Sequence, residues 1–385
     1  MQKTTAIFTT TRAEFGILSP LISELEKNEK MQALLFVGGT HITEEHGKTI
    51  KEIRAGKFHI TKTFDFFLNE DSPYALTKSL GIETFELAEI FNRFNFDAVC
   101  VLGDRLELLP IVQTALLFKK PIIHLHGGEK SEGATDEQIR HMITKAAHLH
   151  FVACNEYAEN IIKMGEEKFR VHNTGALAVD NMANLSLKNK KDLFLELGLD
   201  VEKKTVLMTY HPVTLETGIS AEQQIKNIFS ALENFDLQVM ITAPNIDTGR
   251  EQINNIIQTK VNENNNYFYT ESLGAKNFHN LLKHSEFLIG NSSSGIVEAP
   301  FYKKPTINIG IRQNGRIRHE SIIDTDYSVE AITKGIEKAL SDKFISQIKN
   351  MKYKFGNGNT AKKMVSIIKN TNFDSKFLRK KLTFQ

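Results

Sequence analysis

Ionisable residues gather at two points between residues 99 and 144, where two successive apolar runs each end in glycine followed by charged residues. The first run leads into Gly-Asp-Arg, with Asp104 and Arg105, and the second, PIIHLH, leads into Gly-Gly-Glu, with Glu129. Carboxylates and imidazoles at neighbouring strand ends are the groups that general acid/base catalysis requires. The alternative is a set of helix caps and ion pairs, such as Asp104 with Arg105. The acid/base candidates are Asp104, His124, His126, Glu129, Glu132 and Asp136.

Two His-x-His pairs, His124 with His126 and His148 with His150, stand in apolar runs. Alternate residues of a strand face one side, so each pair could present two imidazoles to a metal ion. The sequence indicates no third ligand for either pair. We therefore interpret these residues as catalytic or hydrogen-bonded histidines, and we expect no metal or other cofactor.

A second group of polar residues, GNSSSGIVEAP, follows the apolar run EFLI. Its serines would begin a helix, where unpaired N–H groups and the helix dipole favour an anion such as a diphosphate. The loop lacks the Lys-Ser or Lys-Thr of a Walker A motif. Glu298 misses the spacing of a capping box and could instead bind a ribose diol. A serine-rich cap without a ligand is the alternative. The loop residues are Ser292, Ser293, Ser294 and Gly295.

Other strand ends carry single candidates. His211 follows the run TVLMTY and precedes a proline that fixes the local backbone. Arg312 and Arg316 follow PTINIG, where either could neutralise a phosphate. Arg12 and His41 follow the first two predicted strands. The alternative is that the histidines are simply buried and the arginines simply lie on the surface. The functional interpretation is supported because all of these residues occur at successive strand ends.

The elements that would position these residues are short apolar runs that alternate with segments of helical period. This pattern is typical of repeated βα units with mainly parallel sheets. We expect one α/β domain over residues 1–185, a second over 186–365, and a C-terminal helix within 366–385 that packs back on the first domain. Ligands bind outside the carboxyl ends of parallel strands, so two facing domains would bind theirs in the cleft between them.

Composition narrows the class of protein. The 385 residues include 48 Lys+Arg and 46 Asp+Glu, and this balance gives no basic field for nucleic acid. No run approaches the roughly 20 apolar residues of a membrane span, and the first residues lack a secretory signal. Cys100 and Cys154 stand in apolar runs and are expected to be buried free thiols. We expect a cytoplasmic protein that binds neither nucleic acid nor membranes.

The chain resembles the hydrolysing UDP-N-acetylglucosamine 2-epimerases of sialic and legionaminic acid biosynthesis over nearly its whole length. The resemblance implies a GT-B arrangement of two Rossmann-like domains with parallel sheets, the active site in the interdomain cleft, and UDP bound by the second domain. It also implies a homo-oligomer, dimer or tetramer, and no cofactor. The motifs occur in the family's order: TTTRAEFG, VGGTHIT, LGDRLE, HGGE, DEQIRHMITK, TGALAVD, TYHPVT, APNIDTG, GNSSSGIVEAP, TINIGIRQNGR and FGNGNTA.

The resemblance further implies the reaction. A base removes the proton from sugar C2, UDP leaves to give a glycal, and water adds to give the free 2-epimer. The substrate would be UDP-N-acetylglucosamine, giving N-acetylmannosamine, or its 4-acetamido-6-deoxy analogue UDP-N,N'-diacetylbacillosamine, giving 2,4-diacetamido-2,4,6-trideoxymannose. A non-hydrolysing 2-epimerase, a GT-B glycosyltransferase and a non-enzymatic sugar-nucleotide sensor stay open as alternatives.

The resemblance also implies residue roles. His126 stands where many family members have a catalytic glutamate, so either His126 or Glu129 supplies that group, or the substrate differs. The other catalytic matches are Asp104, Asp136 and His211, with Arg105 and Arg140 orienting the carboxylates. The matches to UDP and cleft contacts are Arg12, His41, Gly175, Ser292, Ser293, Glu298 and Arg312, with Ser294 and Gly295 in the same serine-rich loop.

Overall fold

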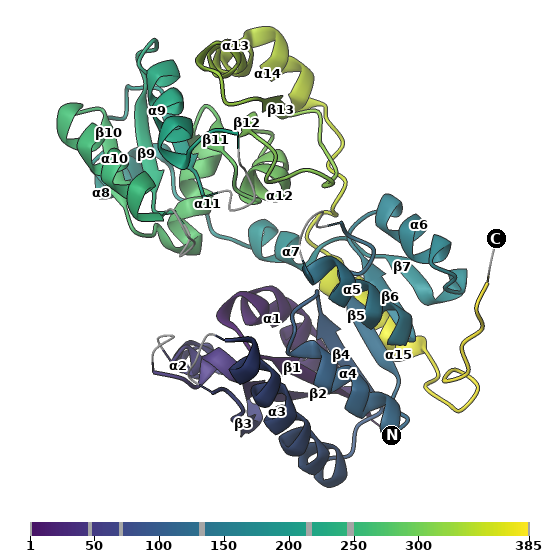
Figure 1. Cartoon of the computed structure of the whole chain (residues 1–385). Helices are drawn as coiled ribbons and strands as arrows, with labels where there is room; N and C mark the ends of the chain where they lie inside the picture. Colours follow the sequence, from purple (N-terminus) through teal and green to yellow (C-terminus); the bar gives the residue numbers. More distant parts are fainter. Residues whose placement is uncertain are drawn as a thin grey trace. The chain divides into compact units, whose positions relative to one another are not determined.

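The computed structural model describes residues 2–44, 48–68, 72–130, 135–212, 218–244 and 250–383 (Figure 1). The chain forms two units, Met1–Asn184 with Lys354–Gln385 and Leu185–Tyr353. Each unit contains one parallel sheet, so the predicted fold class of two Rossmann-like α/β domains is confirmed. The sequence predicts boundaries after residues 185 and 365, whereas the structure returns the chain to the first unit at Lys354.

Seven parallel strands form the sheet of the first unit, in the order β3-β2-β1-β4-β5-β6-β7. The strand order reverses between β1 and β4, and ligands bind at such switch points, beyond the carboxyl ends of the strands. The strands are β1 (Lys3–Thr9), β2 (Met31–Gly38), β3 (Ile60–Phe64), β4 (Ala98–Leu102), β5 (Ile122–Leu125), β6 (Leu149–Val152) and β7 (Val171–Asn173).

Helices cover both faces of this sheet because alternate strand residues point to opposite sides. Ile7 packs with α1, α7 and α15 on one face, and its neighbour Phe8 packs with α3, α4 and α5 on the other. The helices are α1 (Arg12–Glu26), α2 (Ile50–Ala55), α3 (Pro73–Arg93), α4 (Leu108–Leu117), α5 (Thr135–Ala146), α6 (Asn155–Lys163), α7 (Leu177–Ala183) and α15 (Thr360–Asn370), with short 3-10 turns η1 (Gly39–His41) and η2 (Lys168–Arg170).

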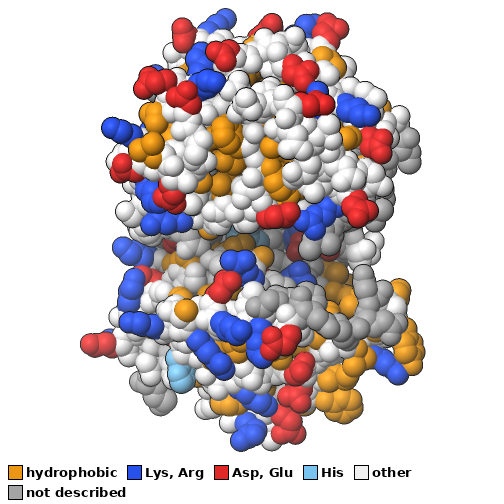
Figure 2. Space-filling view, turned by 90° about the vertical axis from the view of Figure 1, so that its left-hand side faces the viewer, with side chains coloured by type: hydrophobic (Ala, Val, Ile, Leu, Met, Phe, Trp, Pro, Cys, Tyr) orange, Lys and Arg blue, Asp and Glu red, His pale blue; other side chains and the backbone are white. Residues whose placement is uncertain are grey.

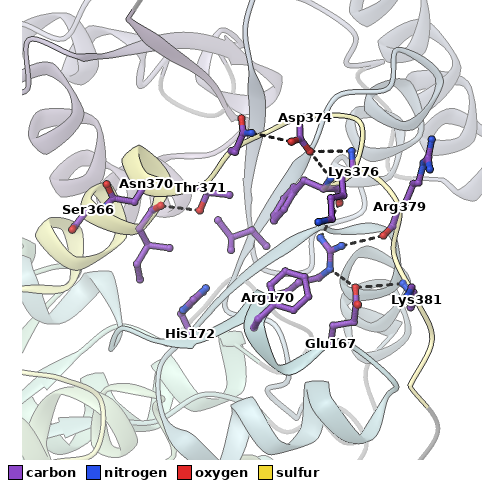
Figure 3. A pocket seen from close by; sticks show the side chains of 15 residues that line it. Glu167, Arg170, His172, Ser366, Asn370, Thr371, Asp374, Lys376, Arg379 and Lys381 are labelled. Atoms are coloured by element: carbon purple, nitrogen blue, oxygen red, sulfur yellow. Dashed lines mark hydrogen bonds and ion pairs between the residues drawn. The ribbon is translucent and has the colours of Figure 1, made fainter.

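The last helix ends earlier than the sequence predicts. In α15 the buried residues Ala361, Met364, Val365 and Ile368 follow a helical period, and the helix stops with that period at Asn370. Residues 371–383 contain no α-helix. They form a segment that we call the C-terminal strap, which runs past η2 and β7 in Figure 3.

Buried Arg170 holds the C-terminal strap. Its Nη1 donates to Phe377 O at 2.9 Å, and its Nη2 donates to Arg379 O at 3.2 Å. Glu167 pairs with Nε at 2.8 Å, and the Phe377 ring lies 4.6 Å from the guanidinium (Figure 3). Phe377 and Arg379, in the basic end of the chain, are therefore fixed through their backbone carbonyl groups.

The sheet of the second unit has six parallel strands in the order β10-β9-β8-β11-β12-β13, which reverses between β8 and β11. Apolar clusters lie on both faces. The strands are β8 (Thr205–Thr209), β9 (Gln238–Thr242), β10 (Tyr267–Thr270), β11 (Leu288–Gly290), β12 (Thr306–Ile309) and β13 (Ile322–Thr325). The helices are α8 (Lys190–Leu197), α9 (Ala221–Leu232), α10 (Arg250–Glu263), α11 (Gly274–His284), α12 (Ser294–Phe301), α13 (Val329–Leu340) and α14 (Asp342–Lys349).

The distribution of charged side chains on the surface agrees with the nearly equal numbers of acidic and basic residues in the sequence. Acidic and basic side chains are interspersed on the face shown in Figure 2. Among the described residues, no helix is both long and apolar enough to cross a lipid bilayer. Cys100 and Cys154 are buried free thiols, as the sequence predicts.

Candidate functional site

The turn after β4 places Asp104 at the carboxyl edge of the first sheet. Gly103 donates its N–H to Leu125 O at 2.9 Å, and its carbonyl oxygen accepts from His124 Nε2 at 2.8 Å. The φ of Gly103 is +82°, which strains any residue with a side chain. Burial lowers the pKa of His124 to about 3, so its ring stays neutral. His124 is thus a hydrogen-bonded histidine that positions the turn.

Buried Arg140 connects this turn to the Gly-Gly-Glu turn after β5. Its guanidinium pairs with Asp104, and Nη1 donates to Glu129 O at 2.9 Å. Glu137 lies 3.3 Å away, and only 4% of Arg140 is exposed. A buried guanidinium needs such partners because an unpaired charge is costly away from water. The expectation that an arginine orients Asp104 therefore agrees with the position of Arg140.

His126 and Glu129, which the sequence leaves as alternatives, form one hydrogen-bonded pair. Nδ1 of His126 lies 2.6 Å from Glu129 Oε1, and because a carboxylate accepts, Nδ1 donates. The Nε2 atom is buried and has no hydrogen-bond partner among the described residues. His126 also has a φ of +63°, a backbone conformation that is uncommon outside glycine and often found at functional sites. An imidazole oriented by a carboxylate can act as a general base.

A cavity of about 600 Å³, here called the strand-end cavity, opens beside Asp104 and Asp136. Asp136 lies in the first turn of α5. Arg105 also lines the cavity, but within the described part of the chain it pairs with Glu107 at 2.7 Å and forms no ion pair with Asp104. Glu132 lies outside the described residues. The lining consists of Thr11, Thr40, Phe66, Phe67, Leu76, Ser79, Leu80, Asp104, Arg105, Leu106, Glu107 and Asp136.

In the second unit, the serine-rich loop joins β11 to α12. Gly290 approaches β8 so closely that a Cβ atom would stand 1.9 Å from Thr209 O. Ser292 Oγ accepts from Ser294 N at 3.3 Å, and Ser293, at the N-cap of α12, makes no side-chain capping bond. Gly295 packs on β12, where a Cβ atom would meet a Thr306 side-chain carbon at 2.5 Å. The start of α12 thus offers hydroxyl and N–H groups at the carboxyl edge of the sheet.

Asn291 ties this loop to two neighbouring strand ends. Its side chain accepts from His211 N at 2.7 Å and donates to His211 O at 2.8 Å. Its backbone oxygen accepts from Arg312 Nη1 at 3.1 Å and from Gln313 Nε2 at 2.9 Å. The structure therefore brings together the predicted residues His211 and Arg312 with the serine loop. Burial, and then Arg312, lower the pKa of His211 to about 4, so its imidazole is neutral at neutral pH.

Glu298 lies on α12 one turn after Ser294, whose side chain donates to its carboxyl group. Although part of the residue stays accessible, packing around the carboxyl group raises its pKa to about 7. The group therefore changes charge near neutral pH, a property that can couple ligand binding to pH.

The family is settled by comparison with known proteins. Residues 23–369 match the family model for UDP-N-acetylglucosamine 2-epimerase. This chain belongs to that family. It is 36% identical over 340 residues to the GDP/UDP-N,N'-diacetylbacillosamine 2-epimerase (hydrolyzing) of Campylobacter jejuni, covering 88% of both chains.

Two further comparisons agree with this assignment. The chain is 32% identical over 374 residues to the UDP-N,N'-diacetylbacillosamine 2-epimerase (hydrolyzing) of Legionella pneumophila, covering 97% of both chains. A solved structure of a putative UDP-N-acetylglucosamine 2-epimerase from Listeria monocytogenes matches with a TM-score of 0.80 at 17% identity. That match covers 97% of this chain and 99% of the other, and it shows that this family member shares the fold.

In this member of the epimerase family, three residues that the sequence predicts as ligand contacts also have contacts within the protein: His41, Arg12 and Gly175. His41 is fully buried, and its ring nitrogens lie 3.1 Å from Thr9 Oγ1 and 2.8 Å from Thr49 Oγ1. Burial lowers the pKa of His41 to about 4, so its ring is neutral at neutral pH, and its contact with the ligand stays a prediction. Arg12 is exposed and pairs with Glu52 at 2.9 Å.

Gly175 allows two segments of the first unit to approach each other. Its φ is +95°, and a Cβ atom would stand 2.9 Å from both Phe355 O and Thr360 Oγ1. Ala176 N donates to Phe355 O at 2.8 Å in the same contact. The absence of a side chain at Gly175 therefore allows close packing against the turn before α15, and its contact with the ligand stays a prediction.

The burial of two carboxyl groups in the first unit of this chain was not predicted from the sequence. Glu83 on α3 is fully buried, and neither of its oxygens has a partner among the described residues. Burial, then Glu107 and Glu14, raise its pKa to about 9. Glu14 completes the capping box of α1 by accepting from Thr11 N at 3.1 Å, and burial raises its pKa. The burial of Glu83 could have been predicted from its position on α3, four residues after Ser79 and four before Leu87, because these residues share the buried face of the helix.

The paired histidines of this family member have separate partners. His148 Nδ1 accepts from Ile122 N at 3.2 Å, and His150 Nε2 lies 3.3 Å from Glu166 Oε2. Within the described part of the chain, no group of three or more histidine, cysteine or acidic residues could hold a metal ion.

Proposed function

We propose that this chain is a hydrolysing UDP-sugar 2-epimerase, which converts a UDP-2-acetamido sugar and water into UDP and the free 2-epimer. The observation that carries the proposal is the His126–Glu129 pair in the first unit, in which a carboxylate orients an imidazole. The two relatives described above are named as hydrolysing enzymes, which favours this reaction over the non-hydrolysing alternative.

The first half of the reaction is an elimination. His126 Nε2 takes the proton from sugar C2, and the C2–H electrons form the C1–C2 double bond. The C1–O bond breaks, and its electrons leave with UDP, which gives a glycal. Glu129 stabilises the imidazolium because it accepts from Nδ1.

The second half is a hydration. Water adds its hydroxyl group to C1, and C2 receives a proton on the face opposite to the one that lost it. Asp104 and Asp136, which line the strand-end cavity, are the proposed groups for this proton transfer and for activation of the water. The sum of both halves contains no redox change, so the proposal includes no cofactor.

We assign the departing diphosphate to the second unit. Ser293 and Ser294 at the start of α12 offer hydroxyl and N–H groups, and Arg312 adds a positive charge beside the same loop. Glu298 would accept from the ribose diol, and His211 would contact the leaving phosphate or the sugar. Three statements stay predictions: that Arg12 contacts UDP, that the active site lies in the cleft between the domains, and that the protein is a homo-oligomer.

The test is incubation with UDP-N-acetylglucosamine and, separately, with its 4-acetamido-6-deoxy analogue in deuterated water. We expect UDP and a free 2-epimer that carries deuterium at C2. Accumulation of the UDP-linked 2-epimer would identify a non-hydrolysing enzyme. A glycosyltransferase would leave the C2 hydrogen in place, and a sensor would bind the nucleotide sugar without turnover. His126→Gln should remove the exchange, whereas exposed His59→Gln should not.

A further inference from the structure

Two adjoining cavities of the first unit lie between α15 and β7, and the proposed reaction uses no residue of either. The larger, of about 780 Å³, is also lined by η2 and the C-terminal strap (Figure 3). The smaller, of about 590 Å³, lies beside the start of α15. The two cavities share His172, Ser366 and Ile367, so one ligand could occupy both. We call them together the strap groove, and their volumes are those of small-molecule sites.

The strap groove is positively charged. Its lining includes six basic and two acidic side chains, an excess larger than the net charge of +2 of the whole chain. Both acidic groups are engaged within the protein, because Glu167 pairs with Arg170 and Asp374 accepts from backbone N–H groups of the C-terminal strap. Lys362 and Lys363 of the smaller cavity are exposed, and within the described part of the chain they form no ion pair. The smaller cavity therefore favours an anion.

The larger cavity combines apolar lining with an exposed aromatic ring. Leu149 and Ile367 supply apolar lining, and Phe169 is 59% exposed. The Arg170 guanidinium lies 4.8 Å from the Phe169 ring centroid and supports the ring from one side. Arg170 is itself engaged, because its N–H groups bond to Glu167 and to backbone oxygens. The exposed part of the Phe169 ring is therefore suited to stack on a planar ring of a ligand, as aromatic side chains stack on nucleic acid bases.

Polar side chains of α15 connect the two cavities. Lys363, Ser366 and Asn370 are three and four residues apart, so they lie on one face of the helix. Within the described part of the chain, the side chains of Ser366 and Asn370 make no hydrogen bond. His172 lies across the groove from them and donates to the Phe169 backbone, which leaves its other ring nitrogen able to accept (Figure 3). From Lys363 to Asn370 the helix rises about 11 Å, which is close to the length of a nucleoside monophosphate.

We propose that the strap groove binds a nucleoside monophosphate. The phosphate group lies between Lys362 and Lys363 in the smaller cavity. The ribose lies beside Ser366, and the base stacks on Phe169 with its polar edge at Asn370. Inorganic phosphate would use only the lysines, and a nucleoside would use only the larger cavity, so the class of ligand follows from the two cavities together. The site does not depend on the proposed 2-epimerase reaction.

The first test titrates the full chain with AMP, GMP, CMP and UMP by calorimetry at low ionic strength. The matched controls are inorganic phosphate, the four nucleosides and polyglutamate. We expect at least one monophosphate to bind about tenfold or more tightly than phosphate or its own nucleoside, and added salt should weaken that binding. If no monophosphate exceeds phosphate, or if polyglutamate binds more tightly than all four, the proposal is overturned.

The second test locates the site. Replacing Lys362 and Lys363 together by alanine should weaken binding of the preferred monophosphate by about tenfold or more. Lys369→Ala, at an exposed position of α15 outside both cavities, should leave it unchanged. Phe169→Ala should weaken it by a similar factor through lost stacking. If thermal unfolding shows that Phe169→Ala is not folded, Asn370→Ala takes its place. Unchanged affinity in the folded groove variants would overturn the assignment.

The third test separates the strap groove from the predicted UDP contacts. Arg312→Ala should weaken binding of UDP and leave the affinity for the monophosphate unchanged, because Arg312 belongs to the second unit. Loss of both in Arg312→Ala would show that the monophosphate uses the UDP site, and the proposal would fall. A chain that turns over no UDP-sugar would remove the proposed reaction, whereas the affinities in the groove variants would still decide this inference.

Discussion

Asn291 and His211 exchange two hydrogen bonds, one from each residue, and so join the serine-rich loop to the end of β8. Both residues are buried, so removing the amide removes two buried hydrogen bonds to the backbone of His211. Asn291→Ala should therefore destabilise the fold by about 2–4 kcal/mol. Exposed Asn265→Ala is the matched control. Urea unfolding measures both, and equal midpoints would contradict this role.

The hydrogen bond between His126 and Glu129 predicts non-additive kinetics. If the two residues act as one base, His126→Gln should lower kcat by about 10²–10⁴-fold. Adding Glu129→Gln to that variant should then have little further effect. Single-turnover release of UDP from His126→Gln, from Glu129→Gln and from the double variant tests the pair. Multiplication of the two single effects in the double variant would show that the residues act independently.

Glu298 predicts a pH dependence of UDP binding. Its pKa is raised to about 7 by burial, so the carboxylate that would accept from the ribose diol forms as pH rises through neutrality. UDP affinity should therefore rise by up to about tenfold between about pH 6 and about pH 8, relative to Glu298→Gln. Calorimetric titration of wild type and variant gives this difference. The exposed control Glu320→Gln should follow the wild type.

Glu83 predicts a pH dependence of stability. Its folded pKa is about 9, against an ordinary 4.5, so between these values the folded chain binds a proton that the unfolded chain lacks. Its contribution to stability is complete below about pH 4.5 and is lost as pH rises towards 9, by at most about 1.4 kcal/mol per pH unit.

Glu83→Gln should remove that slope, because glutamine does not titrate. Compared with the wild type, the variant should gain stability as pH rises, as measured by urea unfolding at several pH values. Glu89→Gln, at an exposed position of the same helix, should keep the wild-type slope. A parallel pH dependence for wild type and Glu83→Gln would show that Glu83 is already ionised in the folded protein.

The sequence predicts the two parallel sheets because most central strands are continuous apolar runs, such as Ala98–Leu102. The edge strands β3 and β13 do not stand out, since ITKTF and IIDT are short and half polar. Strand-end positions of Asp104 and His211 could likewise be predicted, because the carboxyl end of a parallel strand lies at a known edge.

Side-chain pairing could not be predicted in the same way. The bond between His126 and Glu129 depends on the positive φ of His126, and the pair of Asp104 with Arg140 joins residues from different elements. The burial of His41 depends on how the 3-10 turn after β2 packs on the β1 side chain of Thr9. Such contacts follow from packing, and the spacing of residues in a sequence does not encode them directly.

The return of the chain to its first unit has a consequence for protein synthesis. The second unit is one continuous stretch, Leu185–Tyr353, whereas the first lacks α15 and the C-terminal strap until the last residues have been made. Because domains fold as units during translation, nascent chains stopped before Thr360 should be protected from protease over 185–353 and cleaved within 2–184. Protection of both regions would contradict this order. The part of the protein that the ribosome makes first is thus the part that finishes folding last.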